Sequence, residues 1–453
     1  MKAYSEYVDA PLPWLSEIPS HWELARNKNI FQEVKDVVGE NTDAYPLLSL
    51  TTKGIILRDV ASGKGKFPKD FNTYKIVKHG DMVFCLFDID ETPRTVGLSD
   101  YDGMLTGAYA IFHVSNVNPR FTYYCYLSLD NVKAMRPLYS GLRKTINVGT
   151  FLSTKLPVPP RPEQDQIVRF LDWKVASINK LISVKRKQIA LLHERQSVHI
   201  SHIVTHGLRN DVAAKDSGAE WLGDMPEHWY AMRCKYLFSE RDERSRDGLE
   251  QHLSMSQKYG LVPDSQLDER RMLSESYVGG KLCDKDDLVL NRLKAHLGVF
   301  ALAPQSGVIS PDYTVLRSNT TRILPSFAET VLKSERCRGE LCIRVRGIIE
   351  GFWRLYTDDF NTIVLPVPPL DEQAEIVEYI VELRDKAKKY EDTLTQEIST
   401  LQEFKTRLIS NVVTGKIDVR DIEIPDFEYV EETVDSSDED DGDMGDVSKD
   451  EEK

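Results

Sequence analysis

Residues 156–164 read LPVPPRPEQ, and residues 365–373 read LPVPPLDEQ. A second pair of matching stretches precedes them: WLSEIPSHW at 14–22 and WLGDMPEHW at 221–229. The two pairs occur in the same order and are displaced by 209 and 207 residues, respectively. Such a period is far longer than the 20–50 residues of a solenoid repeat, so the repeating unit is a whole domain with an appendage. The sequence therefore predicts a protein of two similar halves.

A long helix is predicted after each proline-rich stretch. Proline cannot donate a hydrogen bond to a sheet and keeps the backbone extended, so each LPVPP segment predicts a stiff exit from a domain. Pro162-Glu163 and Asp371-Glu372 then supply residues typical of a first helical turn. Gly207 and Gly415 are typical of the residue that ends a helix. Each predicted helix has about 45 residues and is roughly 65 Å long at 1.5 Å per residue.

Both helices carry the apolar 4,3 spacing of a coiled coil over about four heptads. In the second helix this spacing also includes Tyr390, Glu397 and Phe404. A helix of this length cannot bury such a stripe alone, and the equivalent helix of the other half is the economical partner. We therefore expect an antiparallel coiled coil that relates the halves by a pseudo-two-fold axis. The residues expected to form the helix pairing are Leu171, Ile178, Ile182, Ile189, Leu192, Ile380, Leu383, Leu394, Leu401 and Leu408.

Each half also carries a globular part long enough to bury its own core. Short apolar stretches alternate with turn-rich pieces, which predicts strands with a few helices and so a mixed α/β (α+β) fold. These stretches are 45–50, 80–87 and 109–114 in the first half, and 287–290, 298–303 and 313–316 in the second. The expected division is a first globular domain at 1–160, a long helix at 161–208, a second globular domain at 209–369, a second long helix at 370–418 and an acidic disordered tail at 419–453.

The net charge of −14 comes from one end of the chain. Residues 421–453 contain 16 acidic residues and two lysines, whereas the rest of the chain has 56 acidic and 56 basic residues. A segment with this charge and few apolar groups is expected to be disordered, and it serves either as a solubilising tail or in a regulatory, DNA-mimicking role. Because the body of the protein is neutral, its charge does not exclude a nucleic-acid partner.

Patterns typical of catalysis and metal binding are missing from the sequence. It has no GxxxxGK[ST] motif and no CxxC pair, and its six cysteines are scattered as in a reduced cytoplasmic protein. His199, His202 and His206 share a helical face, but no carboxylate or cysteine joins them, so a polar helix end is preferred to a metal site. No apolar run approaches the roughly 18 residues of a membrane helix, and no signal peptide is apparent. We expect a cytoplasmic binding protein that does not interact with a membrane.

Basic residues cluster at several places in the neutral body. Lysine and arginine contact phosphates, and arginine also reads guanine edges, although most surface cations are simply solvated. The candidate DNA-binding residues are Lys64, Lys66, Lys69, Arg94, Arg143, Lys144, Arg244, Arg246, Arg271, Arg292, Lys294, Arg344 and Arg346.

The repeated WLxxxPxHW and LPVPPxxEQ motifs, with helices ending near 203–207 and 412–415, resemble the specificity subunits of Type I restriction-modification enzymes. The resemblance covers residues 1 to about 420, and the acidic tail departs from it. It implies two target recognition domains, each reading one half of a bipartite sequence in double-stranded DNA. It also implies that the two helices set the non-specific spacer and dock two methyltransferase subunits, and that restriction subunits join for cleavage.

The same resemblance implies a chain without catalytic residues or cofactors. S-adenosylmethionine belongs to the methyltransferase partner, and ATP and Mg²⁺ belong to the nuclease partner. The halves diverge most at 25–150 and 232–360, as two different half-sites require. The alternative is a coiled-coil adaptor without sequence-specific DNA binding. A fused methyltransferase is disfavoured because no long enough stretch is left to house one.

Overall fold

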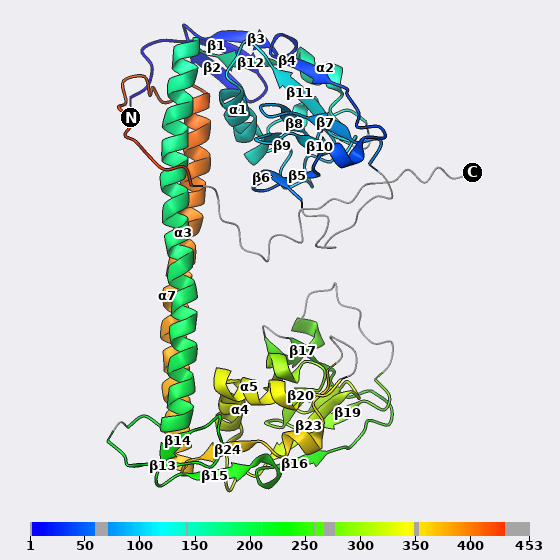
Figure 1. The fold of residues 1–453 in the computed structure, drawn as a ribbon, viewed down its shortest axis with the longest axis vertical. Helices are drawn as coiled ribbons and strands as arrows, with labels where there is room; N and C mark the ends of the chain where they lie inside the picture. The colour runs from blue at the N-terminus through cyan, green and yellow to red at the C-terminus, as the bar shows by residue number, and fades with distance from the viewer. Residues whose placement is uncertain are drawn as a thin grey trace, which may run out of the picture. The chain divides into compact units, whose positions relative to one another are not determined.

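The computed structural model describes residues 2–58, 71–141, 144–209, 211–256, 259–266, 277–347 and 353–430 (Figure 1). The chain divides into two compact units, residues 1–187 with 394–453 and residues 188–393. Each of two long helices, α3 (Arg161–His206) and α7 (Leu370–Val413), contributes residues to both units. The expected mixed α/β character is confirmed. Within the described ranges, no helix is long and apolar enough to span a membrane.

The first unit is built on a four-stranded antiparallel sheet in the order β4-β11-β8-β9, and helix α1 packs against β9 (Figure 1). Strands β8 and β11 lie within two of the apolar stretches predicted as strands, and β5 extends one residue beyond the third. These three predictions are confirmed. The elements before α3 are β1 Tyr7–Leu12, β2 Leu15–Pro19, β3 Glu23–Arg26, β4 Phe31–Val34, β5 Leu48–Thr51, β6 Gly54–Leu57, β7 Lys75–Val77, β8 Met82–Phe84, β9 Val96–Leu98, β10 Gly103–Leu105, β11 Ala110–Val114, α1 Pro119–Asn131, α2 Val148–Ser153 and β12 Lys155–Val158.

The second unit repeats this plan with a four-stranded antiparallel sheet in the order β16-β23-β20-β21. Strands β20, β21 and β23 fall at the three predicted apolar stretches. The elements before α7 are β13 Ala214–Asp216, β14 Asp224–Pro226, β15 Tyr230–Arg233, β16 Phe238–Arg241, β17 Leu253–Ser256, β18 Gly260–Pro263, β19 Lys281–Cys283, β20 Leu288–Asn291, β21 Phe300–Leu302, β22 Gly307–Ile309, β23 Tyr313–Ser318, α4 Pro325–Lys333, α5 Glu335–Arg344, α6 Thr357–Phe360 and β24 Val364–Val367.

Aromatic side chains fill the core of the first unit. Phe84 of β8 and Phe112 of β11 are fully buried, and the ring centroid of Phe151 lies 4.8 Å from that of Phe84 and 5.3 Å from that of Phe112. The second unit buries Phe300 and Phe327 in a comparable cluster. Each fully buried side chain of this kind contributes about 1.5–3 kcal/mol, so each unit is a stable platform for its loops.

In the first unit, α3 and α7 run side by side in opposite directions. Lys405 Nζ donates a hydrogen bond to Asn179 Oδ1 at 3.3 Å, and Lys185 Nζ lies 2.5 Å from Glu397 Oε2. The residue number rises from 179 to 185 on α3 while that of its partner on α7 falls from 405 to 397, so the two helices are antiparallel.

In the second unit, the remaining parts of the two helices have the same relation. His193 Nε2 lies 3.1 Å from Glu391 Oε2, and the rings of His199 and Tyr379 are 6.1 Å apart. Across the two units, the residues expected to pair are buried at Leu171, Ile178, Ile182, Ile380, Leu394 and Leu408 and half-buried at Ile189, Leu192, Leu383 and Leu401.

The stripe predicted for the second helix is wrong at three positions. Tyr390 and Phe404 are each 49% exposed, and Glu397 is also exposed. Ile398, which follows Leu394 by four residues, is only 9% exposed. Burying Ile398 instead of Glu397 avoids the cost of desolvating a carboxylate, so the buried stripe of this helix continues from Leu394 to Ile398.

The tail predicted to be disordered from residue 419 has structure at its beginning. Gln166 Nε2 donates to the carbonyl oxygens of Val419 and Ile422, and Asn179 Nδ2 donates to that of Val430. Hydrogen bonds from α3 to these three carbonyl groups therefore hold Val419, Ile422 and Val430 against the helix. Residues 431–453, which carry most of the acidic groups, lie outside the described residues.

Candidate nucleic-acid interface

Each unit brings a loop and a hairpin together beside its central sheet. In the first unit, Ser140 and Thr145 pair across a hairpin, and Ile146 N then donates to Leu86 O, at 2.8 Å, in the loop that follows β8. Because the loop leaves an inner strand of a rigid sheet, its position is well defined. We call this surface the loop–hairpin face of the unit.

The second unit has the same arrangement at the equivalent place. Arg346 and Arg354 pair across a hairpin, and Leu355 N donates to Arg292 O, at 3.0 Å, in the loop that follows β20. Helix α5 packs on this loop, where Cys342 Sγ lies 3.5 Å from the backbone oxygen of His296.

The loop–hairpin face of the second unit exposes large apolar side chains. The exposed fraction is 73% for Ile343, 47% for Leu297, 46% for Tyr356 and 39% for Trp353. His296 meets the Trp353 ring edge-on at 5.4 Å between centroids. We call Leu297, Ile343, Trp353 and Tyr356 the Trp353 patch. A group of exposed apolar side chains of this kind is typical of a binding surface.

Cations border the Trp353 patch. Lys294 and Arg354 are exposed, and neither pairs with a carboxylate among the described residues. Arg346 is 70% exposed and forms an ion pair with Asp359. Arginine and lysine next to aromatic rings suit a nucleic acid, because the cations meet phosphates while the rings stack on bases or sugars.

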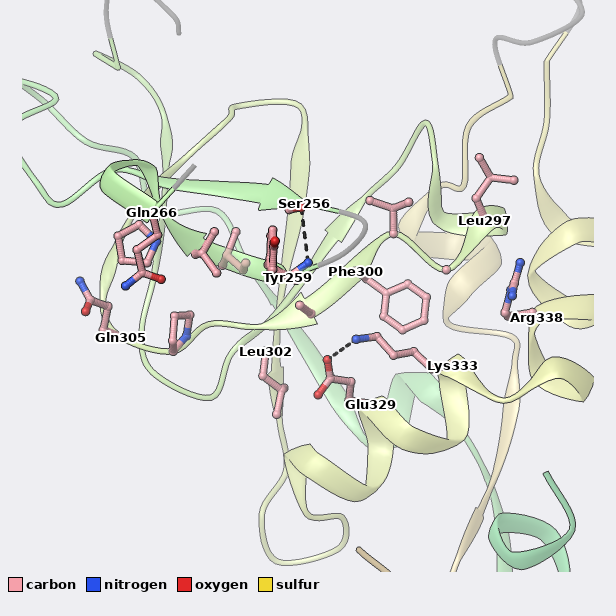
Figure 2. Close-up of a pocket in the computed structure, with 18 residues that line it drawn as sticks. Ser256, Tyr259, Gln266, Leu297, Phe300, Leu302, Gln305, Glu329, Lys333 and Arg338 are labelled. Carbon is pink, nitrogen blue, oxygen red and sulfur yellow. Dashed lines mark hydrogen bonds and ion pairs between the residues drawn. The ribbon is translucent and has the colours of Figure 1, made fainter. Parts of the chain in front are cut away.

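A polar hollow of about 790 Å³ adjoins this face between β18, β21 and helices α4 and α5 (Figure 2). Lys333 Nζ is paired with Glu329 Oε1 at 2.7 Å on one side. Arg338 lies against Gly298 and has no carboxylate partner in the described part of the chain. The hollow therefore offers a guanidinium group, and Gln305 adds an amide, both able to bond the edge of a base.

The loop–hairpin face of the first unit differs in chemistry. Asp90 accepts hydrogen bonds from Arg136 Nε at 2.7 Å and Tyr139 Oη at 3.1 Å, and Lys144 Nζ lies 3.5 Å away. The Arg136 guanidinium holds the pKa of the Asp90 carboxyl below its usual range. This face is a polar network in which Arg136 and Lys144 share the one carboxylate of Asp90, whereas the second unit exposes apolar and cationic groups.

The candidate cations named from the sequence fall into three groups. Those that lie outside the described residues are Lys64, Lys66, Lys69, Arg143 and Arg271. Those paired with a carboxylate are Arg94 with Asp130, Lys144 with Asp90, Arg244 with Asp242, Arg344 with Glu340 and Arg346 with Asp359. Arg292 donates to the Asp312 carbonyl, while Arg246 and Lys294 are exposed. Arg94 is the poorest candidate, because its side chain is only 18% exposed.

Sequence reasoning missed Trp353, Arg354, Arg338 and Ile343. Trp353 and Arg354 are adjacent, and an aromatic residue beside an arginine was a signal that could have been used. Arg338 and Ile343 gave no comparable signal, because only the packing of α5 on the loop after β20 brings them near the patch.

A second exposed feature runs along α3. Leu181 and Val184 are 51% and 47% exposed in the first unit, and Leu191 and Val198 are 62% and 59% exposed in the second. These positions follow one another at steps of three and seven residues, so they share one helical face. This face lies apart from the buried stripe and is available for another helix.

Comparison with known proteins gives a consistent family. Residues 86–191 match the family described as "Type I restriction modification DNA specificity domain". The chain is 22% identical over 434 residues to the type I restriction enzyme MjaX specificity subunit of Methanocaldococcus jannaschii, covering 90% of this chain and 96% of that protein. It is 21% identical to the MjaVIII specificity subunit of the same organism, covering 89% and 95%.

The fold has a counterpart among solved structures. A chain from work on complex assembly and conformational transition of the type I R-M system aligns with a TM-score of 0.54 and 15% identity, covering 88% of this chain and 99% of that chain. The resemblance indicated by the repeated motifs is confirmed, and the matches favour DNA specificity over the adaptor alternative.

Proposed function

This chain is a relative of the Type I restriction-modification specificity subunits, and we propose that its two units each read one half of a bipartite target in double-stranded DNA. The observation that carries the proposal is that one fold plan occurs twice with unlike exposed faces. The sheets have the same strand order, and the loop and hairpin are joined by equivalent hydrogen bonds. Two copies of one scaffold with different surface chemistry suit two half-sites of different sequence.

In the second unit, the Trp353 patch and the adjoining hollow form the proposed reading surface. Lys294, Arg346 and Arg354 supply phosphate contacts, and Arg338 supplies a group that reads base edges. In the first unit, the Asp90 network supplies both donors and acceptors. The lysines of residues 64–69 and Arg143 remain proposed DNA contacts, because the sequence places them in the same half.

The long helices are proposed to set the spacer and to dock the methyltransferase subunits. The buried stripe holds α3 against α7 within each unit, as the ten proposed pairing residues suggest. The outer face with Leu181, Val184, Leu191 and Val198 exposes apolar area that a helix of a methyltransferase subunit would cover. Because two halves repeat the plan, we propose one methyltransferase subunit for each half, with restriction subunits joining for cleavage.

We propose a division of labour in which this chain supplies recognition and its partners supply chemistry. S-adenosylmethionine is then bound by the methyltransferase subunits, and ATP and Mg²⁺ by the restriction subunits. The proposed domains are recognition domains at 1–160 and 209–369 and helices at 161–208 and 370–418. The proposed site of action is the cytoplasm, where the DNA and these partners are found.

The test is a methylome of cells that express this chain together with its methyltransferase subunit, read by single-molecule sequencing. Methyladenine on both strands of a two-part motif, absent without this chain, is the expected result. Trp353→Ala should reduce methylation of the motif, because it removes an apolar side chain that contacts base edges in a groove of the duplex. A stable complex with an active partner that methylates no new sequence would contradict the proposal.

A further inference from the structure

The two repeated motifs meet at a buried carboxylate in the first unit. Glu163, in the first turn of α3, is only 6% exposed. Its Oε1 accepts hydrogen bonds from Tyr4 Oη at 2.6 Å and from Trp22 Nε1 at 3.1 Å. His21 Nε2 lies 2.8 Å from Glu163 Oε2. The His-Trp pair of one motif is thus bound by the glutamate of the other.

The second unit repeats this contact with the equivalent residues. Glu372 lies in the first turn of α7, and its Oε2 accepts a hydrogen bond from Trp229 Nε1 at 3.0 Å. His228 Nε2 lies 2.8 Å from the same oxygen. Trp229 is fully buried, while Glu372 is 20% exposed. We call these two contacts the glutamate joints.

The glutamine beside each glutamate binds a second part of the same recognition domain. Gln164 Oε1 accepts from Asn118 N, where α1 begins, and its Nε2 donates to Pro159 O, both at 2.8 Å. Gln373 does the same in the second unit, since its Oε1 accepts from Leu324 N, where α4 begins, at 2.7 Å. Each long helix is therefore tied at its first turn to two separate segments of the recognition domain.

The end of the other long helix reaches the same place. Gly415 follows α7 with a φ of +73°, and an added Cβ would lie 2.4 Å from Pro19 and 3.4 Å from the Trp22 ring. Gly207 follows α3 with a φ of +81°, and an added Cβ would lie 3.1 Å from the Trp229 ring. Both long helices therefore meet one tryptophan in each unit, where the glutamate joint holds that tryptophan in place.

We propose that Glu163 and Glu372 are positioning residues that hold each recognition domain at a fixed orientation on the paired helices. Glu163 is contacted at both carboxylate oxygens, so a glutamine there directs its NH₂ group at one of the donors. Glu372 is contacted only at Oε2, so a glutamine there keeps an acceptor oxygen but replaces a charged acceptor by a weaker neutral one. Loosening the joint lets the domain tilt on the helices without changing its loops. This inference rests on the proposed function, and it assigns spacer discrimination to residues remote from the loop–hairpin faces.

The test measures methylation of duplexes that carry both half-sites with the native spacer or with a spacer one base pair longer or shorter. The complex of the full chain with its methyltransferase subunit is used. Glu372→Gln should raise the ratio of activity on the altered spacers to activity on the native spacer by about tenfold, the factor expected when hydrogen bonds to a charged acceptor become hydrogen bonds to a neutral one. Glu163→Gln should have at least that effect, because Glu163 also binds Tyr4 and is more deeply buried.

Glu375→Gln is the matched control, since Glu375 is exposed on α7 one turn from Glu372. It should leave spacer discrimination unchanged. Half-site preference should stay constant in all variants. A lower melting temperature with unchanged spacer discrimination, or an equal loss of half-site preference, would overturn the positioning role. A wild-type complex that methylates no duplex in the set would instead refute the proposed function itself.

Trp229→Phe keeps an aromatic ring but removes the N–H donor, and it is used if the glutamate variants do not fold. It should relax spacer discrimination in the same direction as Glu372→Gln, although less strongly, because the His228 contact remains. Discrimination equal to that of the wild type in a folded Trp229→Phe complex would also overturn the proposal.

Discussion

Lengthening the paired helices by one heptad should lengthen the DNA spacer. The insertion is placed after Gln188 in α3 and after Asp392 in α7, between the pairs Lys185–Glu397 and His193–Glu391. Seven residues keep the apolar stripe in phase with a coiled-coil period of 3.5 residues per turn. At 1.5 Å per residue, each helix grows by about 10.5 Å. Since base pairs are about 3.4 Å apart along the DNA axis, this equals about three base pairs.

The assay is the methylome of cells that express the lengthened chain with its methyltransferase subunit. We expect the same two half-sites with a spacer about three base pairs longer, because the loop–hairpin faces are unchanged. A lower activity is also expected, because three base pairs rotate one half-site by roughly 100° at about 10.5 base pairs per turn. The same seven residues added after Lys453 should leave the motif unchanged. New bases in either half-site, or an unchanged spacer in an active complex, would refute the reasoning.

Four further outcomes follow from individual groups. Arg354→Ala should weaken DNA binding and reduce the slope of log affinity against log salt by about 1 in a gel-shift titration, as the loss of one phosphate contact requires. All six cysteines lie in the described part of the chain, and only Cys342 is exposed. Maleimide should therefore label Cys342 first, and bound DNA should slow that labelling. A hydrogen bond from Lys281 lowers the pKa of Asp242 in the folded protein. The ionised Asp242 therefore stabilises the fold at pH values above the unfolded pKa, and this stabilisation is lost as pH falls through the lower folded pKa. Thermal melts should show a melting temperature that falls below about pH 4, and the fall should be smaller in Asp242→Asn. Leu191→Glu should weaken binding of the methyltransferase subunit by about tenfold or more in calorimetry, while DNA binding by the chain alone stays unchanged.

Much of the architecture was accessible from the sequence because it depends on local and periodic signals. Two copies of LPVPPxxEQ predicted two halves, and six apolar stretches predicted strands that the structure contains. Gly207 and Gly415 predicted the helix ends, where both have the positive φ that favours glycine. These features depend on residues close together in the sequence, so they can be predicted without knowing the fold.

The surface and its charges were decided by tertiary structure. Arg94 was a plausible phosphate contact until the fold placed it beside the buried Asp130, and Arg338 became prominent only when α5 packed against the loop after β20. The sequence showed that His-Trp and Glu-Gln recur, but 141 residues separate Trp22 from Glu163, and only folding brings them to 3.1 Å. Periodicity determines which residues share a face of one element. Which faces meet, and which charges cancel, depends on contacts between elements far apart in the chain.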